Sequence, residues 1–202
     1  MCSQDRRGRR VKRWWAVVAY VIVPGIDGSD GEHWQTLWER QWGASAVRIA
    51  PASWSAPELD DWVGAVQGAY EEASRRDSRV VLVAHSLGCW AAAEWLGRET
   101  YGQVGGAFLV APADPQGSAF PRQAASTFVG VSALPLPCPA LVVGSADDPY
   151  CAPEVAEGFA ARWDARWHLV GAYGHINSAS GLGLWREGRE LLDSLTPREP
   201  SR

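Results

Sequence analysis

The sequence predicts a single α/β domain in which helices flank both faces of a doubly wound, mostly parallel sheet. Three observations support this prediction. Short apolar runs of strand length alternate with stretches of helical periodicity along the 202 residues. Several runs, such as residues 80–84, show no polar alternation and are typical of strands buried on both faces. No internal repeat or linker divides the chain, and its length suits one domain with a sizeable core.

The predicted elements alternate along the chain. Strands are expected at residues 16–23, 47–50, 80–84, 105–111, 139–144 and 166–170. Helices are expected at residues 33–42, 55–73, 89–96, 153–163 and 182–195. Ser55 and Glu58 have the spacing of a capping box at the start of the second helix. Residues 112–137 are rich in Pro, Gly, Ser and Ala, with one short helix near 122–128, and are too few for a large lid domain.

The most informative stretch is the third predicted strand and the turn after it. The apolar run ends in Ala84-His85-Ser86-Leu87-Gly88, and helix-forming residues come next. A strand, a sharp turn with a central serine and a helix together form the nucleophile elbow of α/β-hydrolases. Small residues two positions before and after the serine leave room for the turn, although Ala84 replaces the usual glycine. A serine that merely caps a helix is the structural alternative.

Two further reactive residue types follow later strands, in the order Ser, Asp, His. Asp147 and Asp148 come after the fifth predicted strand, and His175 comes after the sixth. Because ligand sites of such sheets lie at the carboxyl ends of the strands, these side chains are expected to meet Ser86 there. The histidine can take the serine proton and return it to a leaving group, while an aspartate fixes the imidazole tautomer. The sequence therefore predicts a Ser–His–Asp triad.

The residues alone leave the acid of this triad open. Pro149 biases Asp148 toward an extended backbone that could direct its carboxylate to the histidine loop, whereas Asp147 lies nearer the strand end. The oxyanion hole is expected to use the backbone N–H of Leu87 and that of Ile26, in the loop after the first strand.

Other reactive side chains are weaker candidates. His85 is expected to point away from the serine, and His168 lies within a strand. A cysteine nucleophile is an alternative, but Cys89 would lie inside the elbow helix and Cys151 beyond the acidic turn. No pattern matches a zinc site, a dinucleotide-binding loop or a P-loop, so we predict no metal and no cofactor.

Composition argues against several other classes of protein. The net charge of −4 argues against a nucleic-acid-binding protein. The apolar run near the N-terminus is too short to span a membrane. The four cysteines form no CxxC pair and are too sparse for a disulfide scaffold, which favours the cytoplasm. Most of the twelve tryptophans are expected in the core and several at a cleft, and a monomer is the simplest expectation.

The terminal segments are expected to lie outside the hydrolase domain, which is predicted over residues 14–196. Residues 1–13 contain six basic residues and one acidic residue and are predicted to be a disordered tail, as are residues 197–202. A basic tail before an apolar run resembles the start of a signal peptide. No small-residue cleavage site follows, however, and cleavage would remove the first strand. The basic tail is therefore expected to be a solvated extension rather than an anchor to anionic surfaces.

The chain resembles the small serine hydrolases of the retinoblastoma-binding-protein-nine/YdeN family. The resemblance covers about residues 16–195 and is carried by Pro24-Gly25, His33-Trp34, Ala84–Cys89, Gly144–Cys151 and Gly174–Gly181. It implies a triad of Ser86, Asp148 and His175, no cofactor, and a poorly defined physiological substrate. The basic tail and the many tryptophans depart from the family. A Leu-x-Cys-x-Glu partner-binding motif is missing, because Ala91 stands where the glutamate is required.

These observations predict a serine hydrolase that cleaves small carboxylic esters through an acyl-enzyme intermediate. The short connection at 112–137 favours an open cleft suited to short acyl groups. The alternative is a protein-interaction module on a hydrolase fold with marginal or vestigial activity. Transfer of the acyl group to an acceptor other than water is a third option.

Overall fold

The computed structural model describes residues 18–98 and 104–195; the predicted tails at 1–13 and 197–202 lie outside the described residues. Its strands are β1 (Val18–Val23), β2 (Ala46–Arg48), β3 (Arg79–His85), β4 (Val104–Val110), β5 (Ala140–Ser145) and β6 (Arg166–Val170). Its helices are α1 (Trp34–Trp42), α2 (Leu59–Arg76), α3 (Leu87–Arg98), α4 (Pro153–Arg162) and α5 (Arg186–Leu195), with short 3-10 turns η1 (Gly43–Ser45), η2 (Ser126–Phe128) and η3 (Ser178–Ser180).

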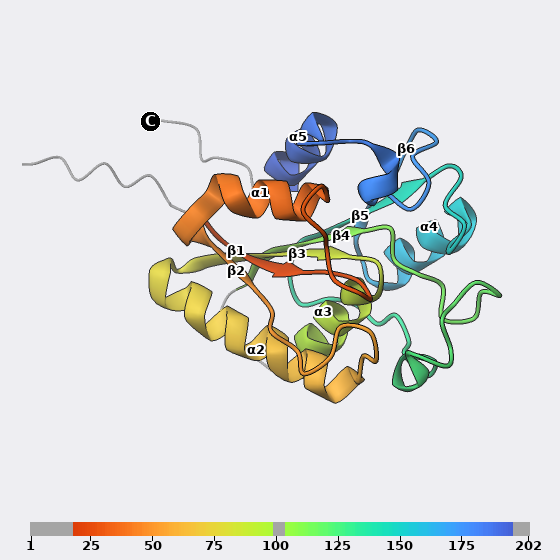
Figure 1. Cartoon of the computed structure of the whole chain (residues 1–202), viewed down its shortest axis with the longest axis horizontal. Coiled ribbons are helices and arrows are strands. Elements are labelled where there is room, and N and C mark those ends of the chain that lie inside the picture. The colour runs from red at the N-terminus through yellow and green to blue at the C-terminus, as the bar shows by residue number, and fades with distance from the viewer. Residues whose placement is uncertain (1–17, 99–103, 196–202) are drawn as a thin grey trace, which may run out of the picture.

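The six strands form one parallel sheet in the order β2-β1-β3-β4-β5-β6 (Figure 1). The chain runs from β1 to one edge and then returns to place β3 on the other side of β1. The boundary between β1 and β3 is therefore the topological switch point, where open α/β sheets place their sites. The predicted doubly wound α/β fold is confirmed.

Helices cover both faces of the sheet, because alternate side chains of each strand point to opposite faces. In β3, Leu82 and Ala84 belong to a core that also contains residues of α2, α3 and α4. Val81 and Val83 belong to a second core with residues of α1 and α5. Figure 1 shows α1 and α5 above the sheet and α2 and α3 below it. All four of these β3 side chains are fully buried, which explains the uninterrupted apolar run.

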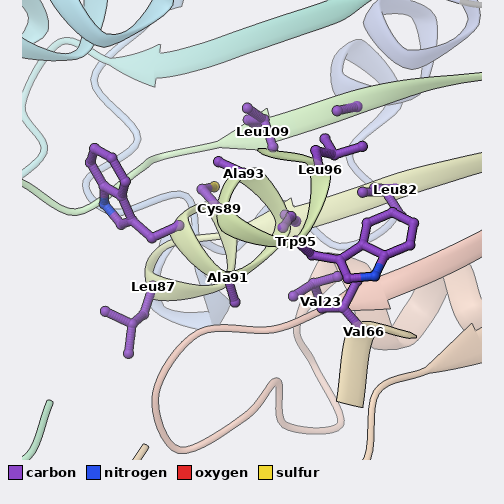
Figure 2. Close-up of a cluster of buried hydrophobic side chains, with 14 of the residues drawn as sticks. Val23, Val66, Leu82, Leu87, Cys89, Ala91, Ala93, Trp95, Leu96 and Leu109 are labelled. Atoms are coloured by element: carbon purple, nitrogen blue, oxygen red, sulfur yellow. The ribbon is translucent and has the colours of Figure 1, made fainter. Parts of the chain in front are cut away.

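Helix α3 is buried along most of its length and packs beside α2 on the same face of the sheet (Figure 1). Figure 2 shows buried side chains of this core. Small residues such as Ala91 and Ala93 let the helix approach its neighbours closely, while Trp95 and Leu96 fill the space beside Leu82. The indole Nε1–H of Trp95 donates to the Gln67 side chain at 2.8 Å, so the buried indole keeps a hydrogen bond. This packing fixes the helix that begins directly after Ser86.

Tryptophans fill much of the opposite core. The ring centroids of Trp34 and Trp38 lie 4.6 Å apart, and that of Trp185 lies 5.2 Å from Trp34. The guanidinium of Arg189 lies 4.4 Å from the centroid of Trp42, a cation–π distance. Seven of the twelve tryptophans are buried in the two cores of the described part of the chain, in agreement with the expectation that most are core residues. These are Trp34, Trp38, Trp62, Trp90, Trp95, Trp163 and Trp185.

Two helix starts differ from prediction. Helix α2 begins at Leu59, and the predicted capping box does not form because Glu58 is the N-cap and has no side-chain cap bond. Instead, the Leu59 N–H donates to Thr127 Oγ1 at 3.0 Å, a partner 68 residues away. Helix α5 begins at Arg186 rather than near residue 182, because Trp185 has a positive φ of 36° that a helix does not allow.

The connection between β4 and β5 carries no lid domain in the part of the chain that the structure describes. Its regular structure is confined to η2, so the predicted short helix is a single 3-10 turn. No helix among the described residues is both long and apolar enough to cross a membrane.

Candidate active site

Ser86 lies at the sharp turn between β3 and α3. Its φ is 55°, a left-handed conformation that costs a non-glycine residue on the order of 1–3 kcal/mol. Two backbone hydrogen bonds hold the turn, from the Ser86 N–H to the Val110 carbonyl at 2.9 Å and from the Cys89 N–H to the Ser86 carbonyl at 3.1 Å. Strain of this kind typically persists at functional sites, because the surrounding structure enforces it.

Two glycines, Gly88 and Gly25, are required by close contacts around the turn that holds Ser86. A Cβ on Gly88 would lie 2.3 Å from the Pro24 carbonyl oxygen, so only glycine fits two residues after the serine. A Cβ on Gly25 would lie 2.8 Å from Ser86 Cβ, which shows how closely the loop after β1 approaches the serine. The sequence predicted the first requirement but not the second, which depends on the pairing of β1 with β3.

The structure brings Ser86, His175 and Asp148 together at the carboxyl edge of the sheet. His175 Nε2 lies 2.8 Å from Ser86 Oγ, and His175 Nδ1 lies 2.9 Å from both carboxylate oxygens of Asp148. In the neutral imidazole, Nδ1–H donates to the carboxylate and Nε2 accepts the serine proton. The side chains of His175 and Asp148 are only 9% and 2% exposed, which shields this hydrogen-bonded chain from water.

Asp147 points elsewhere. Its Oδ1 accepts from the Ser145 hydroxyl at 2.9 Å and from the Gly174 N–H at 2.7 Å. Asp147 therefore ties the end of β5 to the loop just before His175, while Asp148 contacts the imidazole. The geometry separates two residues between which the sequence alone could not decide.

Two side chains from other elements hold the histidine loop. His85 Nε2 lies 2.8 Å from the His175 carbonyl oxygen, and the Trp34 indole N–H donates to the Ile176 carbonyl at 2.8 Å. Because a carbonyl can only accept, His85 Nε2 carries the proton. Ile176 itself has a positive φ of 49°, so this loop also holds strain next to the site.

His85 makes no hydrogen bond with Ser86 among the described residues, but its ring lies close to the candidate site. The His85 ring centroid lies 4.9 Å from that of His175, and His85 lines the same cavity as Ser86. Burial lowers the pKa of His85 well below its ordinary value, so the ring stays neutral. The position of His85 next to Ser86 was the only sequence feature that pointed to the site. Its hydrogen-bond partner, the His175 carbonyl, is 90 residues away in the sequence.

His33 is a second buried histidine in this region. It is the N-cap of α1, where its Nδ1 accepts from the Gln35 N–H at 3.2 Å, and its ring lies 4.8 Å from that of His85. Burial lowers the pKa of His33 to about 4, so it is neutral at physiological pH. His33 was noted in the sequence as part of the His33-Trp34 pair, without an assigned role.

A cavity of about 430 Å³ opens beside Ser86, a volume typical of small-molecule sites. It is lined by Gly25, Ile26, Asp27, Gly28, Asp30, His33, His85, Ser86, Leu87, Ala113, Pro121, Tyr150, His175, Asn177, Ser178 and Ala179. The backbone N–H groups of Ile26 and Leu87 make no hydrogen bonds with the turns, loops and side chains that the structure describes. Contrary to expectation, no tryptophan of the described residues lines this cavity.

The described cysteines are poor nucleophiles. Burial raises the pKa of Cys151 to about 12 and that of Cys138 to about 11, and it raises the pKa of Cys89 well above its ordinary value. The reactive thiolate is therefore strongly disfavoured. His168 lies in β6, away from the cavity. Among residues 18–98 and 104–195, no group of three or more His, Cys, Asp or Glu side chains could hold a metal ion.

Comparison with solved structures places this site in a known fold. A protein described as a YdeN-like hydrolase from Pectobacterium atrosepticum is 33% identical, with a TM-score of 0.75 over 89% of this chain and 93% of that chain. The ydeN gene product of B. subtilis is 22% identical, with a TM-score of 0.71 over 88% and 97%. A thermophilic esterase from Thermogutta terrifontis is 14% identical, with a TM-score of 0.64 over 89% and 91%, a likeness of fold alone. The fold is that of the α/β-hydrolases.

A match to a family model identifies the family of the chain. The family model described as "Serine hydrolase" matches residues 20–194, so the chain belongs to the serine hydrolase family with YdeN-like relatives. The predicted resemblance is confirmed. A search of the curated proteins finds no match.

Proposed function

We propose that this member of the serine hydrolase family cleaves small carboxylic esters through an acyl-enzyme intermediate. The observation that carries the proposal is the hydrogen-bonded chain from Ser86 Oγ through His175 to the buried Asp148 carboxylate. A serine hydroxyl is a weak nucleophile at neutral pH and needs an adjacent base held in the correct tautomer, which this arrangement supplies.

In the first half of the reaction, Ser86 Oγ attacks the ester carbonyl while His175 Nε2 takes its proton. The Asp148 carboxylate keeps Nδ1 protonated and stabilises the imidazolium that forms. The negative charge on the former carbonyl oxygen is stabilised by the N–H groups of Leu87 and Ile26, which line the cavity and have no described loop partner. The imidazolium then gives its proton to the departing alcohol.

In the second half, a water molecule takes the place of the alcohol. His175 Nε2 removes a proton from this water, the hydroxide attacks the acyl carbon, and the imidazolium returns the proton to Ser86 Oγ as the acid leaves. The cavity volume of about 430 Å³ is sufficient for a small-molecule ester.

The test is hydrolysis of p-nitrophenyl esters graded by acyl length, by the wild type and Ser86→Ala. In another triad hydrolase, loss of the serine costs about 10⁶-fold in turnover, and we expect a comparable loss here. Ser74→Ala is the matched control, because Ser74 lies in α2 and does not line the cavity beside Ser86. If Ser86→Ala hydrolyses the esters within tenfold of the wild type, Ser86 is not the nucleophile. A protein-interaction module with vestigial activity predicts no Ser86-dependent hydrolysis at all.

A further inference from the structure

A second groove of about 500 Å³ lies on the histidine side of the candidate site. Its lining includes Tyr150, Tyr173, His175, Asn177 and Ala179. Four of these residues, Tyr150, His175, Asn177 and Ala179, also line the cavity that contains Ser86. The two spaces therefore adjoin at His175, but Ser86 and the proposed oxyanion residues line only the first cavity.

The order of proton transfers assigns different parts of a substrate to the two spaces. The carbonyl carbon must lie at Ser86 Oγ, with its oxygen at the N–H groups of Leu87 and Ile26. The leaving alcohol receives its proton from His175 Nε2, so it must lie on the histidine side of the carbonyl. A groove that contacts His175 and not Ser86 is thus reached by the alcohol part of the ester.

We propose that the second groove binds the alcohol part of the substrate and that it selects neutral alcohols with an aromatic ring, held against Tyr150. This inference rests on the proposed ester hydrolysis. Tyr150 is 38% exposed, and its ring centroid lies 4.5 Å from that of His175. Tyr150 therefore offers an accessible aromatic surface next to the group that protonates the alcohol.

The lining supports a neutral aromatic ligand. The groove has two tyrosine rings in its wall, Tyr150 and Tyr173, and no Lys, Arg, Asp or Glu side chain among its lining residues. Offset or edge-to-face contacts between aromatic rings contribute about 0.5–1.5 kcal/mol beyond the burial of their area. The side-chain oxygen Oδ1 of Asn177 already accepts from the Ala179 N–H, whereas the side-chain nitrogen Nδ2 makes no hydrogen bond among the described residues and can donate to the ligand.

The test compares two rate ratios in the wild type, Tyr150→Ala and Tyr150→Phe. The first ratio is kcat/KM for benzyl acetate over ethyl acetate, which varies only the alcohol. The second is kcat/KM for ethyl butyrate over ethyl acetate, which varies only the acyl group. General damage to His175 lowers all three rates together and cancels in both ratios.

We expect Tyr150→Ala to lower the benzyl-to-ethyl ratio roughly tenfold, which corresponds to the loss of one aromatic contact. The butyrate-to-acetate ratio should stay within about twofold, and Tyr150→Phe, which keeps the ring, should retain most of the benzyl preference. An unchanged alcohol ratio, or an equal change in both ratios, overturns the groove assignment and leaves the proposed hydrolysis standing. Absence of any Ser86-dependent hydrolysis in the wild type overturns both.

Discussion

Replacing each of the two adjacent aspartates by asparagine should separate their roles. In Asp148→Asn, the single remaining oxygen is needed at the Oδ1 position, which accepts from the Tyr150 N–H at 2.9 Å. The new NH₂ then takes the Oδ2 position, 2.9 Å from His175 Nδ1, where it can only donate, while the oxygen at Oδ1, also 2.9 Å from Nδ1, no longer carries a negative charge. The amide therefore no longer enforces the tautomer with its proton on Nδ1, and the tautomer that carries its proton on Nε2 cannot accept the proton of Ser86.

The same wrong tautomer lowers turnover about 10⁴-fold in the chymotrypsin-type triad, which corresponds to about 5.5 kcal/mol in the activation free energy. We expect a loss of this size for Asp148→Asn on p-nitrophenyl acetate. Asp147→Asn keeps an oxygen that can accept from Ser145 and Gly174, so only the charge of those hydrogen bonds is lost. It should cost about 1 kcal/mol of stability and less than about tenfold in turnover.

The assay measures kcat for both variants beside their melting temperatures, so that a folding defect is not taken for a catalytic one. The reasoning is refuted if Asp147→Asn is the inactive variant while Asp148→Asn turns over at nearly the wild-type rate. Equal, small losses in both variants would mean that neither carboxylate orients His175.

Two further predictions concern stability. Gly88→Ala should destabilise the fold by about 3 kcal/mol or more, because the new Cβ would lie 2.3 Å from a backbone oxygen. Gly97→Ala on the same helix is the control, because its Cβ would have no atom within 4 Å, and it should stabilise the fold by about 0.5–1 kcal/mol. Equal melting temperatures of the two variants would contradict this prediction. Because the unfolded state protonates His33 near pH 6.5 and the folded state only near pH 4, the unfolding free energy should fall by about 3 kcal/mol as pH drops through this range. His33→Asn, which preserves an N-cap side chain, should remove this contribution when urea unfolding is measured at several pH values, while the buried His85 keeps its own pH dependence. An unchanged dependence on pH would show that His33 does not titrate in this way.

The residues proposed to carry the chemistry were readable from the sequence, because each lies within a few residues of the carboxyl end of a predicted strand. Ser86 was marked by the strand–turn–helix pattern, and His175 by its place after the last strand. Parallel strands bring such positions to one edge whatever the details of packing. The same regularity explains why the order of elements was predicted correctly even where their ends shifted by a few residues.

The contacts that position the loop of His175 could not be predicted from the sequence. His85 holds the His175 carbonyl from 90 residues away, and Trp34 holds the Ile176 carbonyl from 142 residues away. Such contacts depend on the packing of α1 against the sheet, which no local pattern describes. The start of α2 was misplaced for the same reason, because Thr127 rather than Ser55 supplies the hydroxyl at its first turn.

The central claim is that Ser86 is an activated nucleophile, and covalent labelling tests it most directly. A fluorophosphonate probe reacts with the folded wild type, and mass spectrometry of the tryptic digest locates the adduct. We expect one adduct, on the peptide of residues 80–98, in which Ser86 is the only serine. Ser86→Ala and heat-unfolded wild type should remain unlabelled, because the first lacks the hydroxyl and the second lacks the neighbouring base. An adduct on another peptide, or none in the folded wild type, would contradict the account.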